Sequence, residues 1–291
     1  MNTKAYAKIN LCLDVKGRRN DGYHEVSMVM QQLMLADDIS VEKRDDERIV
    51  LTMEPAVAGI PTDGRNLMVK AAELFREKQR ISQGVTMRLV KRIPSEAGLA
   101  GGSADAAAVI MGMNDLFDTE LGIDELCKLG ARIGADVPFC ILGGTALAEG
   151  IGEILTPLSI PEGTTLPYVL LVKPGAGVST PVMYRALDDH PDLPHPDTPV
   201  YVRLLTSKGV GAAARYTANI FEEVVIPKIP VIRSIKKDMT SAGAFAACMS
   251  GSGPTVFGLF ESRETMGAAA EKIRRASYAG ELAGVYETTF R

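Results

Sequence analysis

The sequence predicts an α+β fold, because segments with strand periodicity and segments with helix periodicity follow one another in no regular order. Apolar and polar residues largely alternate over residues 4–15 and again over 85–93, which is typical of strands. Residues 109–117 instead repeat apolar side chains at helical spacing. With 291 residues, 46% of them hydrophobic, the chain is long enough to form one or two domains.

The same patterns predict the elements in chain order. The first half is expected to contain strands at 4–15, 26–35, 39–43, 49–53 and 85–93, a helix that begins after Asn66 as its cap, and further helices over 109–117 and 122–134. The second half is expected to contain strands at 145–149, 153–158 and 168–173, an irregular connector at 187–199, helices within 200–219, 228–242 and 265–276, a pair of strands within 244–260, and a last strand at 284–290.

Charge and composition exclude several classes of function. The formal net charge is −4 and basic residues form no cluster, so nucleic acid and anionic membranes are not expected partners. No apolar run reaches the roughly 18–20 residues of a membrane span, and the amino terminus has no signal-peptide pattern. The four cysteines lack CxxC spacing and three lie in apolar segments, so disulfides and zinc are not expected. We therefore expect a cytoplasmic protein.

The loop at residues 94–103, Pro-Ser-Glu-Ala-Gly-Leu-Ala-Gly-Gly-Ser, is the strongest functional signal in the chain. A strand, a glycine-rich loop and a helix amino terminus can bind phosphate together, because free N–H groups and the helix dipole attract an anion. Ser103 is suited to cap the helix or to donate a hydrogen bond to an anion. The loop matches neither a Walker nor a Rossmann pattern. Tight packing before an alanine-rich helix is the alternative interpretation.

Three other places combine polar side chains with regular surroundings. Lys8 and Asn10 lie on one face of the first strand, where either a cleft or solvent explains them. Tyr23 and His24 follow an Asn-Asp-Gly turn and suit either a flat ligand or ordinary surface. Asp136 precedes Val-Pro and is suited to cap a helix or to act as a general base. The residues alone leave both interpretations open at each place.

The order of four short motifs is more specific than any one of them. AYAKINL (5–11), PSEAGLAGGSADAAA (94–108), GADVPF (134–139) and GSGPTVFGLF (251–260) together resemble the small-molecule kinases of the GHMP superfamily. DGYHEV, GEILTPL and PGAGVSTPVMY resemble the branch of that superfamily whose members phosphorylate 4-diphosphocytidyl-2-C-methyl-D-erythritol. The resemblance covers almost the whole chain.

The resemblance implies a two-lobe fold and a reaction. A domain of the ribosomal S5 domain 2-like type is expected over residues 1–158, and a ferredoxin-like domain over 159–291. The implied reaction moves the γ-phosphoryl group of ATP to the tertiary 2-hydroxyl of the cytidylated methylerythritol, in the non-mevalonate route to isoprenoid precursors, with Mg²⁺ beside the triphosphate. The expected partners are therefore ATP and a small-molecule substrate, and we expect a monomer or weak homodimer.

The resemblance also implies roles for individual residues. Asp136 matches the family's proposed base, and Lys8 matches the lysine that keeps this carboxylate ionised and offsets charge on the transferred group. Tyr23 and Tyr184 match the two aromatic positions that sandwich the cytosine, although a phenylalanine is frequent at the second. His24 is expected to read the polar edge of the base. The further residues implied to seat the substrate are Asn10 and Thr180.

The implied ATP-binding residues are the loop itself and its surroundings: Asn66, Lys91, Pro94, Ser95, Glu96, Ala97, Gly98, Leu99, Ala100, Gly101, Gly102, Ser103, Ala104 and Asp105. The family usually has Gly-Leu-Gly-Gly-Gly-Ser-Ser, whereas this chain has alanine at positions 100 and 104. Because alanine rarely adopts a positive φ, we expect an ordinary backbone conformation at Ala100. Ala104 lacks the second hydroxyl, so a phosphate contact from this pair comes from Ser103 or from a backbone N–H.

Three other functions fit parts of the pattern. A GHMP kinase for another alcohol agrees less well with Tyr23, His24 and Tyr184. A non-catalytic nucleotide or sugar sensor on the same fold is disfavoured because both Asp136 and Lys8 are present. An RNA-binding module is disfavoured by the acidic net charge, although the amino-terminal fold type also occurs in ribosomal proteins.

Overall fold

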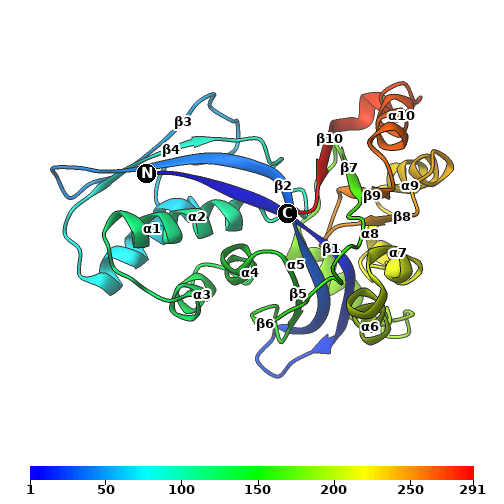
Figure 1. Ribbon diagram of the computed structural model, residues 1–291, viewed down its shortest axis with the longest axis horizontal. Coiled ribbons are helices and arrows are strands. Elements are labelled where there is room, and N and C mark those ends of the chain that lie inside the picture. Colours follow the sequence, from blue (N-terminus) through cyan, green and yellow to red (C-terminus); the bar gives the residue numbers. More distant parts are fainter. The chain divides into compact units, whose positions relative to one another are not determined.

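The computed structural model describes residues 1–291, with helices and strands in mixed order (Figure 1). The α+β class that the sequence predicts is thereby confirmed. The chain forms two compact units: unit 1 contains Met1–Ala7, Leu35–Ser95 and Ala100–Gly143, and unit 2 contains Lys8–Met34, Glu96–Leu99 and Gly144–Arg291. Two long strands, β1 (Asn2–Arg18) and β2 (His24–Lys43), each begin in one unit and end in the other.

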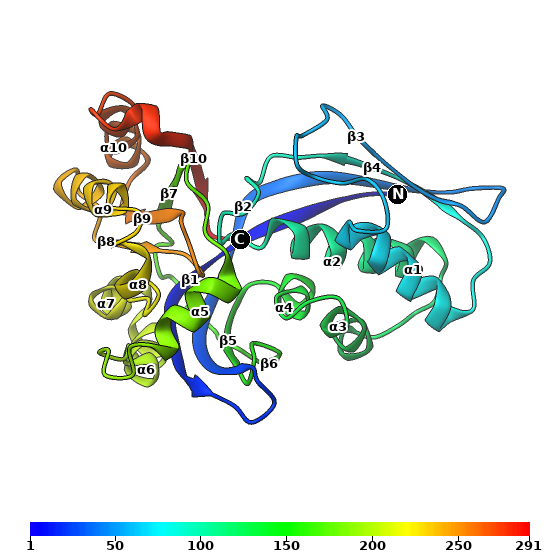
Figure 2. The same ribbon diagram turned by 180° about the vertical axis from the view of Figure 1, so that it is seen from behind.

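Unit 1 is a sheet with helices on one face. β4 (Val85–Val90) pairs antiparallel with the end of β2, where Ile39 lies opposite Leu89, and parallel with β3 (Ile49–Met53). The helices are α1 (Leu67–Gln79), α2 (Gly101–Leu116), α3 (Ile123–Ala131) and α4 (Val137–Leu142). α1 and α2 run side by side along the sheet, and α3 and α4 pack next to them (Figures 1 and 2).

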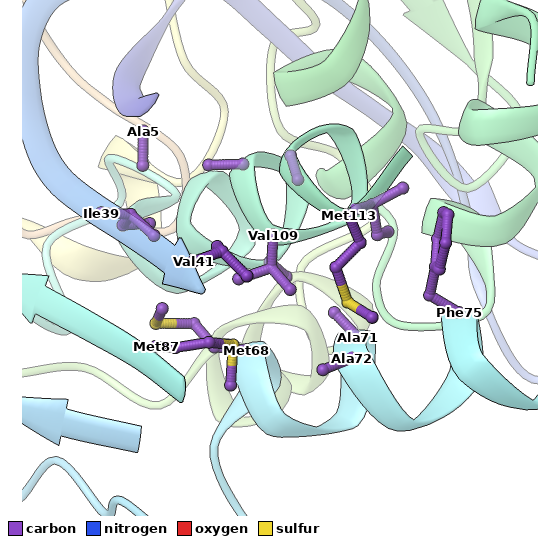
Figure 3. Packing of buried hydrophobic residues seen from close by; sticks show 14 of the residues in the cluster. Ala5, Ile39, Val41, Met68, Ala71, Ala72, Phe75, Met87, Val109 and Met113 are labelled. Carbon is purple, nitrogen blue, oxygen red and sulfur yellow. The ribbon is translucent and has the colours of Figure 1, made fainter. Parts of the chain in front are cut away.

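The core of unit 1 lies between this sheet and the pair α1 and α2 (Figure 3). Ile39, Val41 and Met87 come from the strands and meet Met68 of α1 and Val109 of α2, and all five side chains are buried. A run of buried alanines in α2 lets neighbouring backbones approach closely. Burial of apolar surface contributes about 25 cal/mol per Å². The packing of these side chains therefore stabilises the position of α2 and of the end of the glycine-rich loop that precedes it.

Unit 2 contains a four-stranded antiparallel sheet in the order β10-β7-β9-β8. Its strands are β7 (Tyr168–Pro174), β8 (Ala246–Met249), β9 (Val256–Phe260) and β10 (Leu282–Thr289). The helices α9 (Val231–Ser241) and α10 (Arg263–Arg274) pack against it (Figure 2). The first part of β2 pairs with β5 (Thr145–Glu149), which pairs with β6 (Ile154–Pro157). The remaining helices are α5 (Thr180–Asp188), α6 (Thr198–Lys208), α7 (Val210–Ala213) and α8 (Glu222–Val225).

Most elements lie within a few residues of their predicted positions, and the differences have local causes. The two strands predicted over 26–43 are one continuous strand, because β2 pairs with β5 along its first part and with β4 along its last. The sequence does not predict α5 or α8, which are short. All four cysteines are free and three are buried, as the sequence predicts. Every helix falls short of the length and apolar character that a bilayer span requires.

Candidate active site

Three residues of the glycine-rich loop have a left-handed backbone, and two of them are not glycine. φ is +50° at Glu96, +72° at Gly98 and +54° at Ala100. The prediction of an ordinary backbone at Ala100 is therefore wrong, because this residue occupies the cap position of α2, where its carbonyl accepts the N–H of Ala104 at 2.8 Å. A left-handed alanine costs roughly 1–2 kcal/mol, and the packing of α2 offsets that cost.

Of the two roles that the sequence suggests for Ser103, the structure excludes the cap, and Ala104 lies in the core. Because α2 begins at Gly101, Ser103 lies in its first turn and does not cap it. Ala104 is 1% exposed and belongs to the apolar core of unit 1. The side chain at this position is thus a methyl group that packs in the core and supplies no hydroxyl to a phosphate.

The middle of the loop is fixed by the second glycine-rich turn of the chain, around Ser250. The buried Ser250 hydroxyl donates to the Gly98 carbonyl at 2.9 Å and accepts the backbone N–H of Asn10 at 3.3 Å. The Leu99 carbonyl accepts the backbone N–H of Lys8 at 3.1 Å. Sequence reasoning missed Ser250, although the motif GSGPTVFGLF pointed to this turn. The turn therefore positions the loop against β1.

Lys8 and Asn10 lie in the interior of unit 2. Lys8 is 4% exposed, and its Nζ donates to Oδ1 of Asn10 at 2.7 Å. Asn10 is fully buried, and its Nδ2 lies 3.1 Å from Sδ of Met28. The interpretation of this strand face as solvated surface is therefore wrong, because both faces of β1 are covered here. An ammonium group that is removed from water and held by an amide oxygen suits a role in charge stabilisation.

Asp136 immediately precedes α4 and has a half-buried side chain. The predicted helix start is confirmed, with a proline in the first turn, but the Asp136 side chain makes no capping hydrogen bond. The capping interpretation is therefore wrong at the level of the side chain. The backbone of Asp136, and not its carboxylate, therefore forms the start of α4.

Asn66 is explained by its structural role. Its Oδ1 accepts the N–H of Met68 at 2.9 Å, which caps α1, and its Nδ2 donates to the Pro61 carbonyl at 2.7 Å. The prediction that Asn66 caps a helix is confirmed. Both ends of the amide are thus engaged within unit 1.

Lys91 is the centre of a buried charge cluster that sequence reasoning only partly found. Its Nζ donates to Asp37 at 2.5 Å and to Asp105 at 2.7 Å. Burial raises the pKa of Asp105 to about 7; Lys91 opposes this shift and the Asp37 carboxylate adds to it. Burial acts to lower the pKa of Lys91, but the two carboxylates outweigh it and raise that pKa. Asp37 lies outside every sequence motif, so the sequence does not indicate that it belongs to this cluster.

His24 and Tyr184, which are distant in the sequence, are stacked in unit 2. Their ring centroids are 4.6 Å apart with planes at 28°, and the Tyr184 ring meets Phe221 edge-on at 4.9 Å. His24 Nε2 lies 2.7 Å from Oδ1 of Asp188. Sequence reasoning missed Phe221 and Asp188, because neither lies in a motif. Tyr23 is 61% exposed, so the residue is accessible to a ligand.

Thr180 begins α5, and its hydroxyl lies 2.7 Å from the hydroxyl of Ser252. This contact connects the start of α5 to the turn that also holds Gly98. The structure contains no group of three or more His, Cys, Asp or Glu side chains arranged to hold a metal ion.

Comparison with known proteins identifies the family. Sequence models described as GHMP kinases N terminal domain and GHMP kinases C terminal match residues 66–144 and 204–279. A 4-diphosphocytidyl-2-C-methyl-D-erythritol kinase of Acetivibrio thermocellus is 45% identical over 278 residues, which is 96% of this chain and 96% of the relative. The chain belongs to this kinase family. A family member of the same name from Geobacillus kaustophilus is 46% identical over 266 residues, 91% of this chain and 90% of the relative.

Solved structures agree with the family assignment. The crystal structure of a 4-(cytidine 5'-diphospho)-2C-methyl-D-erythritol kinase matches with a TM-score of 0.81 and 33% identity, over 100% of this chain and 99% of that chain. A homoserine kinase from Cytophaga hutchinsonii matches with a TM-score of 0.73 at 19% identity, over 99% and 95% of the two chains, which shows the shared GHMP fold alone. The two matched sequence ranges lie on either side of residue 158, where the domain boundary stays a prediction.

Proposed function

We propose that this chain transfers the γ-phosphoryl group of ATP to the 2-hydroxyl of 4-diphosphocytidyl-2-C-methyl-D-erythritol, a step of the non-mevalonate route to isoprenoid precursors. The observation that carries the proposal is 45% identity to a kinase of that name over 96% of both chains. The buried lysine of β1, the left-handed loop before α2 and the stacked aromatic pair are consistent with it.

In this proposal, Asp136 is the general base. Its carboxylate accepts the proton of the 2-hydroxyl as that oxygen forms a bond to the γ-phosphorus, while the bond from the γ-phosphorus to the bridging oxygen breaks and ADP leaves. Lys8 contributes the positive charge that offsets the developing charge on the transferred group. Asn10 supports this role, because its Oδ1 accepts from Lys8 Nζ at 2.7 Å and so orients the ammonium group.

The nucleotide in this proposal binds the loop at 94–105. The N–H groups at the start of α2 have no partner within the helix, and the helix dipole there favours an anion. Ser103 lies in this first turn and supplies a hydroxyl. The residues before it include three with positive φ, and left-handed residues in a turn are a way to direct successive backbone N–H groups to one anion.

Mg²⁺ is part of the proposal as a companion of ATP. The chain has no preformed cage of acidic side chains, which fits an ion that kinases bind mainly through substrate phosphates, water and one or two carboxylates. When bound, Mg²⁺ neutralises charge on the triphosphate. The loop backbone and Ser103 would then hold the Mg·ATP complex through its phosphates.

The cytidine in this proposal is bound by Tyr23, His24 and Tyr184. Asp188 holds Nε2 of the His24 ring at 2.7 Å, so the ring is oriented before a ligand arrives. Tyr184 is braced by Phe221 on its edge. Aromatic side chains with fixed orientations lose little conformational entropy when a flat base stacks on them.

An assay of ADP release with Mg·ATP tests the proposal. The acceptors to compare are 4-diphosphocytidyl-2-C-methyl-D-erythritol, its uncytidylated phosphate and homoserine. Turnover with the cytidylated compound alone is expected. Turnover with another alcohol would reject the assignment of the aromatic residues, and ATP binding without any turnover would favour a sensor. The cytoplasmic location and the monomeric or weakly dimeric state stay predictions.

A further inference from the structure

Asp37 is a fully buried acidic residue that belongs to none of the sequence motifs. It lies in the part of β2 that enters unit 1, next to the end of β4. Its carboxylate accepts three hydrogen bonds: from Lys91 Nζ at 2.5 Å, from the backbone N–H of Ile93 at 2.8 Å, and from the backbone N–H of Arg92. One side chain therefore determines the course of the chain where β4 ends and the glycine-rich loop begins.

Lys91 carries this constraint from β4 to the helix on the other side of the loop. Its side chain is 6% exposed, and its second bond goes to Asp105 of α2 at 2.7 Å. A methyl group placed on Gly101, the first residue of α2, would lie 3.0 Å from Lys91 Nζ and 3.0 Å from Cγ2 of Ile93. The ammonium group is thus packed directly against the helix start, where a larger residue would require Lys91 or Ile93 to shift.

The two carboxylates of the cluster are not equivalent. Asp37 has all its hydrogen bonds from groups that lie before the loop, whereas Oδ1 of Asp105 is buried without a hydrogen-bond partner. Three hydrogen bonds fix the Asp37 carboxylate at the end of β4. Burial raises the pKa of Asp105 to about 7. Asp37 therefore anchors Lys91 to the strand side of the loop, and Asp105 connects it to α2.

We infer that Asp37 is a positioning residue for nucleotide binding, which acts through Lys91 to hold the end of β4 and the start of α2 in register across the loop. The inference rests on the proposed nucleotide site at 94–105. Because Asp37 is fully buried, it acts in this inference without touching the nucleotide. Its effect on ATP affinity follows because the loop can present its N–H groups to phosphate only when both of its ends are fixed.

A double-mutant cycle with Mg·ATP as the probe tests this inference. The variants are Asp37→Asn, Lys91→Met and the double variant, and the readouts are the Kd of Mg·ATP by titration calorimetry and kcat with the cytidylated acceptor. Asp37→Asn is expected to weaken Mg·ATP binding about tenfold, as the loss of one buried charge-assisted bond predicts. kcat at saturating ATP is expected to change less than about threefold, because no reacting group is altered.

The double variant separates positioning from a purely structural role. If Asp37 acts through Lys91, the double variant binds Mg·ATP within about twofold of Lys91→Met. The amide oxygen of asparagine can still accept the N–H groups of Arg92 and Ile93, so the bond to Lys91 is the one that Asp37→Asn alters. Losses that multiply would overturn the inference. Where Asp37→Asn alone fails to fold, the comparison of the double variant with Lys91→Met still decides, since removal of both members of the Asp37–Lys91 pair is tolerated better than removal of one.

Asp38→Asn is the matched control. Asp38 is the next residue, is partly exposed, and pairs with Lys4 and Arg92 at the surface. Its substitution is expected to leave the Kd of Mg·ATP within about twofold of the unchanged chain, as surface ion pairs contribute little. If Asp37→Asn binds Mg·ATP as tightly as the unchanged chain while Lys91→Met binds it more weakly, the inference is overturned but the assignment of Lys91 to the nucleotide site stands. Wild-type affinity in Lys91→Met would overturn both the inference and the assignment of Lys91 to the nucleotide site.

Discussion

Among the glycines of the loop, Gly98 is the one whose replacement by alanine is expected to destabilise the loop most. A Cβ at this position would lie 2.1 Å from the backbone oxygen of Ser250, and φ is +72°. The left-handed backbone costs roughly 1–2 kcal/mol. Relief of the overlap, with overpacking costs of about 1–3 kcal/mol, requires a shift of Ser250, which is held by its own hydrogen bonds to Gly98 and Asn10.

The sum is a loss of roughly 2–5 kcal/mol in the free energy of unfolding. It corresponds to a fall in melting temperature of roughly 4–20 °C, at about 2–4 °C per kcal/mol for chains of this order of size. Displacement of the loop by about 1 Å is also expected to lower kcat/KM for ATP about 100-fold. Thermal denaturation and steady-state kinetics with ATP as the varied substrate measure the two effects separately.

Gly102→Ala is the matched control for the stability measurement. The nearest atom to a Cβ at Gly102 is Cδ1 of Leu67 at 3.6 Å, an ordinary contact, and the residue lies in the first turn of α2. This variant is expected to be more stable by about 0.5–1 kcal/mol, because alanine favours the helix. If Gly98→Ala keeps both the melting temperature and kcat/KM of the unchanged chain, the reasoning about the turn at Ser250 is wrong.

Three further predictions concern the chemistry, the aromatic pair and the buried cluster. Asp136→Asn is expected to lower kcat at least ~100-fold, because a general base is lost, while the Kd of ATP in calorimetry stays nearly unchanged; near-normal turnover would remove Asp136 from the mechanism. Tyr184→Ala is expected to raise the KM of the cytidylated acceptor about fivefold or more, from a loss of about 1 kcal/mol in stacking, whereas an unchanged KM would make the pair purely structural. Because burial raises the pKa of Asp105 from 3.8 to about 7, the folded state binds its proton more tightly, so this carboxyl lowers stability progressively as pH rises through that window. Urea denaturation between about pH 4 and 7 is expected to show that decline in the unchanged chain and a weaker one in Asp105→Asn; equal slopes would contradict it.

The sequence by itself predicts the elements that depend on local patterns. The alternation of residues 4–15 predicts β1, the helical spacing of 109–117 predicts α2, and Asn66 predicts the start of α1. Each of these depends on periodicity or on a cap within a few residues, so the chain contains the information in one place. The four motifs in their order likewise sufficed to indicate the kinase family.

Only the tertiary structure decided what surrounds these residues. Lys8 alternates as a surface residue does, yet it is buried because segments far along the chain cover that face of β1. Ala100 is left-handed because it holds the cap position of α2, where the propensity of alanine alone predicts an ordinary backbone. Asp37 reaches Lys91 across 54 positions, and Ser250 reaches Gly98 across 152. Contacts between residues so distant in sequence leave no periodic trace, so only the folded chain reveals which side chains hold the loop in place.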